Sequence, residues 1–216
     1  MKQTFLLVTI ITLFSITASA QIKKGSTLLG GQFFYNNSNV DWNTAQPDQT
    51  NKFGNFGISA GRALKENSVL GLYVSYGHAR ARNNYNGAVF TNSTADLYNA
   101  GVFFKKYKKL AKNFCFFGEL GTGYVGRNQS QADVSGANEV KIKSSGGELY
   151  LTPGFSYSVL KKLQIEILIP GIAEIQYSIT KTTSLNNNSK ENDFHISSNL
   201  NSSLLNSVGI GFRFIL

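Results

Sequence analysis

Two residues of one short segment have the side chains that a hydrolase uses as nucleophile and base. His195 and Ser197 are separated by one residue, so on a β-strand both side chains would lie on the same face. A hydroxyl nucleophile needs an imidazole that takes its proton and a carboxylate that orients the imidazole. The nearest carboxylates, Glu191 and Asp193, precede the histidine, and none follows Ser197. We therefore interpret both residues as polar residues of a loop, with a hydrolase as the alternative.

The second histidine and the single cysteine offer no further chemistry. His78 lies beside Arg80 and Arg82, and one histidine without partner ligands has no metal geometry. Cys115 is the only cysteine, so an intramolecular disulfide is excluded. It shares strand parity with Phe117, which predicts a small, inward-facing filler. The sequence therefore predicts no catalytic, cofactor-binding or metal site.

The first twenty residues predict an exported protein. Lys2 precedes an apolar stretch from Phe5 to Phe14, and Ala18-Ser19-Ala20 presents small residues where a signal peptidase cuts. We expect a signal peptide at 1–20 and a single domain at 21–216. After Gln21 no apolar run approaches the roughly 18 residues of a membrane helix. Aromatic residues make up 12% of the chain, which also has 21 glycines, and this composition favours strands.

Apolar and polar residues alternate with a period of two along most of the remaining chain. Alternation over this length predicts β-strands with one apolar face and one small or polar face. A Pro170-Gly171 pair interrupts the seventh run and predicts a bulge or kink. The eight runs cover roughly residues 27–36, 53–64, 69–77, 98–104, 116–124, 148–159, 163–179 and 208–216.

The connections between these runs alternate between short and long. The short ones are 65–68, 105–113 and 160–162, and the long, polar ones are 37–51, 80–94, 127–144 and about 181–202. Aromatic residues of the apolar faces fall at the ends of the runs, as they do at the two interfaces of a membrane barrel. We therefore predict an all-β fold, an eight-stranded antiparallel up-and-down transmembrane β-barrel in the outer membrane, rather than a soluble β-sandwich. Both termini should lie on the periplasmic side.

Three segments carry a family resemblance. The final stretch, 207–216, alternates apolar residues up to Leu216, where targeting strands of outer-membrane barrels often end in Phe. Together with the segments 118–124 and 153–157, it makes the chain resemble the OmpA/OmpX-type outer-membrane β-barrel domain family over essentially its whole mature length. This resemblance implies an architecture rather than a reaction, so function must be argued from a site. His195 and Ser197 distantly resemble the His-x-Ser motif of outer-membrane lipid A deacylases, but the Asn expected directly after the Ser is displaced to Asn199.

The interior of an eight-stranded barrel is only wide enough for its own side chains. We therefore expect a packed lumen and no open diffusion pore. Inward-facing positions combine glycines with Tyr73, Phe103, Phe117 and Tyr150.

Charged residues also fall at inward positions: Glu119, Glu148, Glu166 and Arg213. Isolated buried charges are costly, so these should pair. Glu166 lies near the start of the seventh run and Arg213 near the end of the eighth, and the two runs should be antiparallel neighbours. We predict that Glu166 accepts a hydrogen bond from Arg213, with Glu119 as the next partner of that arginine.

The net charge of +9 includes one basic cluster, which we interpret as a solvated turn: Lys105, Lys106, Lys108, Lys109 and Lys112. A basic cluster of this kind could bind nucleic acid or anionic lipid, and export argues against nucleic acid. The expected partners are outer-membrane lipid and lipopolysaccharide, and an extracellular ligand of the long loops, where Trp42 and Tyr85 are aromatic candidates. We expect a monomer without cofactors, with a structural or surface-interaction role and no enzyme activity. A lipid A-modifying enzyme is the alternative.

Overall fold

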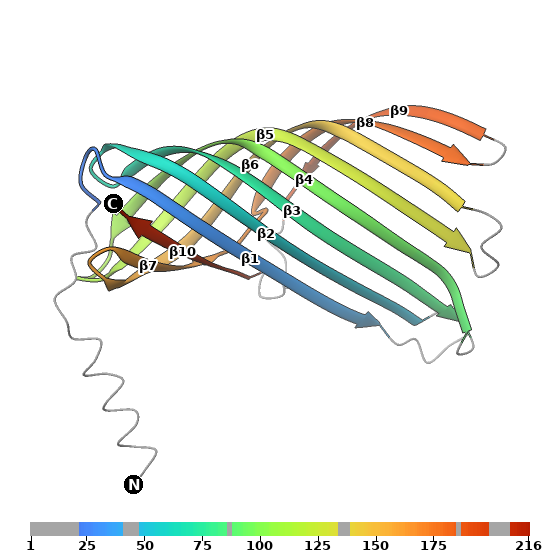
Figure 1. Ribbon diagram of the computed structural model, residues 1–216, viewed down its shortest axis with the longest axis horizontal. Helices are drawn as coiled ribbons and strands as arrows, with labels where there is room; N and C mark the ends of the chain where they lie inside the picture. Colours follow the sequence, from blue (N-terminus) through green and yellow to red (C-terminus); the bar gives the residue numbers. More distant parts are fainter. Residues whose placement is uncertain (1–21, 41–47, 86–87, 134–138, 185–186, 199–207) are drawn as a thin grey trace, which may run out of the picture.

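The computed structural model describes residues 22–40, 48–85, 88–133, 139–184, 187–198 and 208–216, and almost all of these form antiparallel strands. The expected signal peptide and Trp42 lie outside the described residues. Figure 1 shows long, tilted strands wrapped around one axis. The strands are β1 Thr27–Val40, β2 Asp48–Lys65, β3 Ser68–Tyr85, β4 Ala88–Lys109, β5 Phe114–Asp133, β6 Glu139–Leu160, β7 Leu163–Leu168, β8 Ala173–Ser184, β9 Asn187–Ser197 and β10 Gly209–Ile215.

Strand pairing forms a ring of eight. Each strand from β1 to β6 pairs with the next, β6 pairs with β7, β7 with β10, and β10 returns to β1. The hairpin of β8 and β9 continues outward on the far part of β6. β7 with β8 therefore forms the predicted seventh strand, and β9 and β10 are the two described parts of the eighth. The predicted eight-stranded fold is confirmed.

The seventh strand is interrupted at the predicted kink. β7 ends at Leu168 and β8 begins at Ala173, with Pro170 and Gly171 between them. Proline has no N–H for the ladder, and Gly171 takes a positive φ of 66°, which favours glycine. Both β7 and β8 pair with β6, so the direction of the seventh strand continues across the break.

The long connections are shorter than predicted. β3 and β4 are joined across residues 86 and 87 alone, and β9 lies inside the segment predicted as a loop from 181 to 202. In these outer parts polar residues dominate both strand faces, and the outward Phe194 and Ile196 of β9 are too few to show as an apolar alternation in the sequence. The strands form nevertheless, because hydrogen bonds between neighbouring strands satisfy the backbone N–H and C=O groups whatever side chains the two faces carry.

Most of the outward wall is apolar. Phe56 and Leu72 expose 52% and 64% of their surface, and outward-facing Val, Leu, Ile, Phe and Tyr residues continue this belt around the ring. An exposed apolar surface of this extent is typical of a face that contacts lipid. Among the described residues, no helix is long and apolar enough to cross a membrane.

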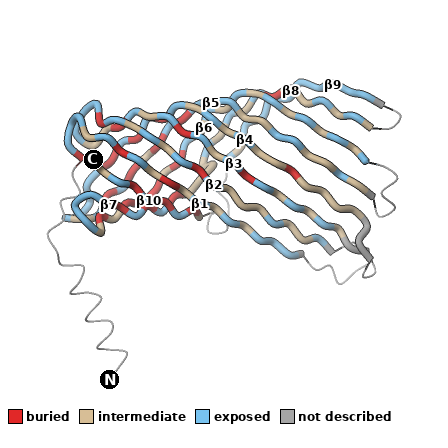
Figure 2. Tube along the Cα trace, viewed as in Figure 1, coloured by how far each residue is buried: buried red, intermediate tan, exposed pale blue. Residues whose placement is uncertain are grey.

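Buried residues gather in one half of the molecule. Figure 2 shows most of them in the half near the short turns, where the C-terminus lies. Their apolar part forms one cluster, which includes Ile22, Leu28, Phe103, Tyr107 and Phe117. By the orientation usual for these barrels, the short turns lie on the periplasmic side, so this is the periplasmic half.

Inward glycines make room for the aromatic rings of this half. Gly154 is the cross-strand partner of Phe117, and a Cβ on Gly154 would overlap the Phe117 ring. Gly71, opposite Phe103, is placed in the same way. The rings therefore lie against the bare backbone of the neighbouring strand.

We expect Gly154→Ala to destabilise the barrel by about 1–3 kcal/mol, because the new methyl group overpacks the lumen against Phe117. Gly118→Ala is the matched control, since a Cβ there meets nothing within 4 Å. The stability of both variants is measured by urea unfolding in lipid vesicles, with heat-modifiable gel migration as the readout of the folded fraction. Equal stability of the two variants would contradict the proposed packing.

Candidate functional site

A cluster of buried charges crosses the lumen of the periplasmic half. Arg213 on β10 donates from Nε to Glu166 Oε1 at 3.1 Å and from Nη2 to Glu166 Oε2 at 3.2 Å. Glu166 lies on β7, the strand paired with β10. The predicted hydrogen bond between Arg213 and Glu166 is therefore confirmed, and it is bidentate, the strongest arrangement for these groups.

Lys105 on β4 joins this pair to a second carboxylate. Its Nζ lies 2.9 Å from Glu166 Oε2 and 2.9 Å from Glu119 Oε2. Glu119, predicted as the next partner of Arg213, is thus held by a lysine instead. Two carboxylates and two cations make this cluster of four residues, hereafter the lumen charge cluster, neutral.

The prediction that Lys105 belongs to a solvated turn is wrong. Its side chain has 0% exposure, because β4 continues to Lys109 and Lys105 has the same inward parity as Phe103 and Tyr107. The other lysines of that run, Lys106, Lys108, Lys109 and Lys112, are exposed. Strand parity was the available signal, but a run of five lysines within eight residues concealed it.

Aromatic rings enclose the lumen charge cluster. Lys105 Nζ lies 4.2 Å from the centre of the Phe117 ring, and Arg213 Cζ lies 5.8 Å from that of Phe103. The hydroxyl of Tyr107 donates to Glu166 Oε1 at 2.7 Å. Hydrogen bonds and cation–π contacts take the place of water around most of these groups, whereas Nη1 of Arg213 has no hydrogen-bond partner among the described residues. This layer closes the periplasmic half of the lumen.

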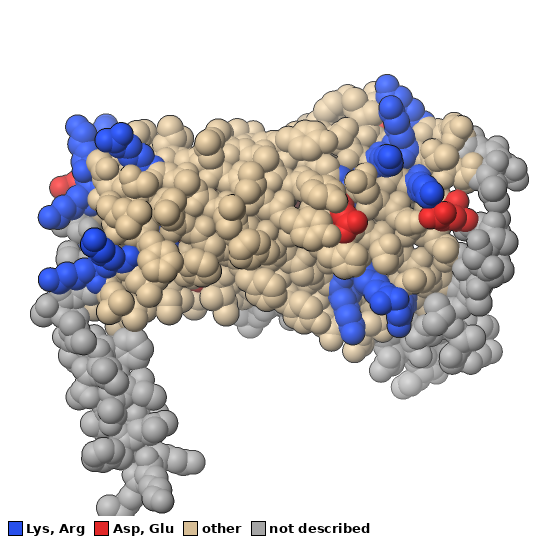
Figure 3. Space-filling model, viewed as in Figure 1, with Lys and Arg blue, Asp and Glu red and all other residues tan. Residues whose placement is uncertain are grey.

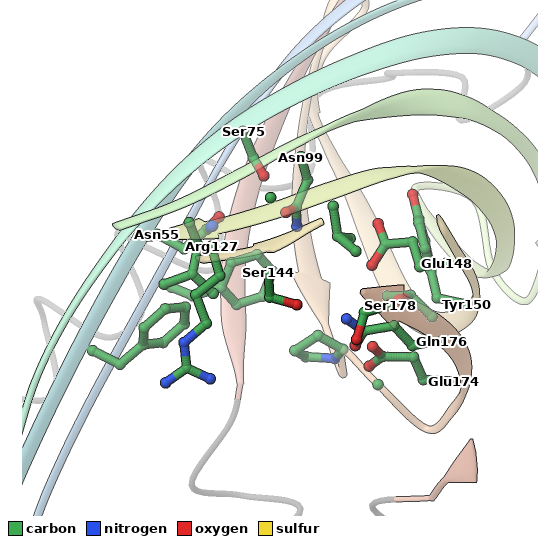
Figure 4. Close-up of a pocket in the computed structure, with 18 of the residues that line it drawn as sticks. Asn55, Ser75, Asn99, Arg127, Ser144, Glu148, Tyr150, Glu174, Gln176 and Ser178 are labelled. Atoms are coloured by element: carbon green, nitrogen blue, oxygen red, sulfur yellow. The ribbon is translucent and has the colours of Figure 1, made fainter. Parts of the chain in front are cut away.

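The outer half of the lumen is open, and the prediction of a lumen packed throughout is wrong there. A cavity of about 750 Å³ extends outward from Glu119 and Tyr150. Figure 4 shows Glu148, Glu174 and Gln176 on one side of it and Arg127 on the other. Many inward residues in this half are small, such as Ser144 and Ser178, and they leave the space unfilled.

The carboxylates of the cavity are bound by tyrosines. The Tyr73 hydroxyl donates to Glu148 Oε1 at 2.8 Å, and the Tyr150 hydroxyl donates to Glu119 Oε1 at 3.1 Å. Glu148 was predicted to pair with a charge, yet among the described residues its side chain is bound by this neutral hydroxyl. The two Tyr rings meet edge to face, with their centroids 5.7 Å apart. Such a lining can hold a small polar molecule by hydrogen bonds.

The structure places His195 on the cavity but does not complete a hydrolase site. His195 and Ser197 share one face of β9, opposite Gln176 and Glu174 of β8. Among the described residues, no hydrogen bond joins His195 to Ser197 or to a carboxylate. A nucleophile, base and orienting acid within hydrogen-bond reach are therefore not assembled in this arrangement.

The remaining residues singled out in the sequence lie apart from one another. His78 is on the outer wall, with Nδ1 2.9 Å from Asp96 Oδ1, whereas Cys115 is buried in the lumen. Tyr85 is the last residue of β3. No group of three or more His, Cys, Asp or Glu side chains that could hold a metal occurs among the described residues.

We expect Arg213→Met to destabilise the protein by about 3–5 kcal/mol, because it removes half of the positive charge that neutralises the lumen charge cluster. The double variant Arg213→Met/Glu166→Met keeps the Lys105–Glu119 pair. Its loss of unfolding free energy should therefore be smaller than the sum of the losses in the single variants Arg213→Met and Glu166→Met. Urea unfolding in vesicles gives all the values for this cycle.

Glu139→Gln is the control for that cycle, because it removes an exposed ion pair with Lys141. We expect a change below about 1 kcal/mol for this variant. If the loss of unfolding free energy in the double variant equals the sum of the losses in the two single variants, Arg213 and Glu166 do not act as a pair.

Comparison with known proteins places this fold among outer-membrane proteins. No family model matches the sequence, and no curated protein sequence matches it. The crystal structure of the outer membrane protein OprG from Pseudomonas aeruginosa matches with a TM-score of 0.52 and 13% identity, over 94% of this chain and 99% of that one. A major outer membrane protein from Thermus thermophilus matches with a TM-score of 0.50 and 11% identity, over 88% and 99% of the two chains. Identities this low show the fold alone. The chain therefore has the fold of small outer-membrane β-barrel proteins.

Proposed function

We propose that this protein is a non-conducting outer-membrane barrel with a structural or surface-interaction role at its outer end, and that it is not an enzyme. One observation carries the proposal: the lumen charge cluster and the rings around it fill the periplasmic half of the lumen. A solute that enters the outer cavity would meet Glu119, Lys105 and Phe117 across its path. Passage would require the buried ion pairs to separate, which is costly.

The outer end supports the surface role. β3, β4, β5 and β6 continue well past the tyrosines of the apolar belt, so they carry polar residues beyond the membrane. A rigid scaffold that presents strand ends and short connections is a common platform for recognition. The cavity beneath them is lined by polar side chains from several of these strands. We propose that an extracellular ligand contacts this end.

We expect the mature protein to give no stable porin-like conductance in planar bilayers. Phe103→Ala/Phe117→Ala removes the two rings that enclose the lumen charge cluster, so it should produce measurable current. The matched control is Phe104→Ala/Phe116→Ala, which removes two rings from the lipid-facing wall and should leave the bilayer silent. A stable current through the unmodified protein, comparable to that of a general porin, would refute the proposal.

The lipid A-modifying alternative has its own test. We expect cells that express the protein to show the same lipid A acyl chains as cells that express His195→Ala or Ser197→Ala, because no reactive pair is assembled. Mass spectrometry of extracted lipid A makes this comparison. Loss of acyl chains that depends on both residues would establish the enzyme instead.

A further inference from the structure

A basic depression lies on the outer wall, on the face of the strands that also carries the lipid-facing belt. It has a volume of about 380 Å³ and extends over β1, β2 and β3. The residues that line it are Asn37, Asn39, Thr50, Lys52, Arg80 and Arg82. We call these six residues the basic groove.

The register of the sheet brings the three cations of the basic groove together. Lys52 on β2 is the direct cross-strand partner of Arg80 on β3, and Thr50 is the partner of Arg82 one row further out. Asn37 and Asn39 of β1 face Lys52 and Thr50 on the other side. Like charges in adjacent positions of a ladder are destabilising unless an anion lies between them. The arrangement therefore favours an anionic ligand.

Among the residues whose side chains the structure describes, no carboxylate lines the basic groove, and none of the ion pairs involves its three cations. The nearest acid along β4, Asp96, accepts hydrogen bonds from His78 and from the Tyr76 hydroxyl. Its charge is thus already engaged by other groups.

The distance of the basic groove from the apolar belt indicates which anion it contacts. Tyr76, which is 47% exposed in the aromatic end of the apolar belt, lies four residues before Arg80 on β3. At about 3.3 Å per residue and a tilt of about 40°, four residues raise the backbone by about 10 Å. The headgroup layer extends about 5–7 Å beyond the hydrocarbon on each side, and long Arg and Lys side chains reach back toward it. The cations therefore lie at the level of the outer lipid headgroups.

Lys and Arg residues outside the basic groove also lie near the ends of the barrel. Figure 3 shows Lys and Arg side chains near the two ends of the barrel, with patches of Asp and Glu among those of the outer end and a largely uncharged wall between the ends on the face in view. At the outer end, Lys143, Lys181 and Lys190 form a second row of direct cross-strand neighbours on β6, β8 and β9. An excess of positive charge on this outer wall complements an anionic headgroup layer.

We propose that the basic groove binds a phosphate of the lipid A part of lipopolysaccharide in the outer leaflet. The guanidinium groups of Arg80 and Arg82 donate to phosphate oxygens in the fork geometry that suits phosphate, and Lys52 adds a third positive charge. Thr50 and the two asparagines supply neutral donors. The acyl chains of the same lipid lie along Phe56, Ile58 and the rest of the apolar belt below.

The test compares two lipids and two variants of the mature protein in detergent micelles. The lipids are bisphosphorylated lipid A and the same lipid with both phosphates removed, and native mass spectrometry gives the fraction of protein that carries each. The groove variant is Lys52→Gln/Arg80→Gln/Arg82→Gln. The control variant, Lys106→Gln/Lys108→Gln/Lys109→Gln, removes the same charge from exposed residues at the periplasmic end.

We expect the groove variant to bind bisphosphorylated lipid A on the order of a hundredfold more weakly, since each basic residue near an anionic surface contributes roughly a factor of five. The control variant and the unmodified protein should bind it equally, and both should prefer it to the lipid without phosphates. Heat-modifiable migration confirms that each variant is folded.

Three results would overturn the proposal. The first is equal affinity for the two lipids, and the second is an equal loss in the groove and control variants, which would indicate a response to net charge alone. The third is complete displacement of lipid A by millimolar inorganic phosphate, which would indicate a site for the free ion.

Discussion

The requirement that buried charges be paired organises the inside of this barrel. Glu166 accepts from Arg213, Lys105 and Tyr107 at once, and Lys105 also contacts Glu119. These residues come from β4, β5, β7 and β10, which are far apart in the sequence. A charge left without its partner inside a narrow lumen is poorly solvated, so each of the four strands is held in one register relative to the others.

Strand parity predicted the part of this arrangement that depends on neighbouring strands. Arg213 and Glu166 could be paired from the sequence, because the seventh and eighth strands must be adjacent in an up-and-down barrel. Lys105 was missed, because it stands in a run of lysines whose other described members are exposed. Its position depends on how far β4 extends, and that extent is set by pairing with β5 rather than by local composition.

The outer half was harder to predict for two physical reasons. Above the apolar belt polar residues dominate both strand faces, and β9 has only Phe194 and Ile196 on its outward face, so the sequence pattern predicts loops for β9 and for the ends of β3 and β4. The cavity results from the sizes of side chains on many strands, including Ser144 and Ser178, and their sum is not visible in any one segment. The two halves of the barrel thus differ in kind: one is packed and apolar around its ion pairs, and the other is polar and hollow.

The position of β10 in the ring has a consequence for how the molecule is made. β10 pairs with β1 on one side and with β7 on the other, and it follows the other described strands in the chain. Until β10 has been synthesised, the edges of β1 and β7 that it covers lack their partner, and their N–H and C=O groups stay unpaired. Exposed strand edges of this kind pair readily with other chains. During its transit to the membrane the nascent polypeptide must be kept from such association until the closing segment has arrived.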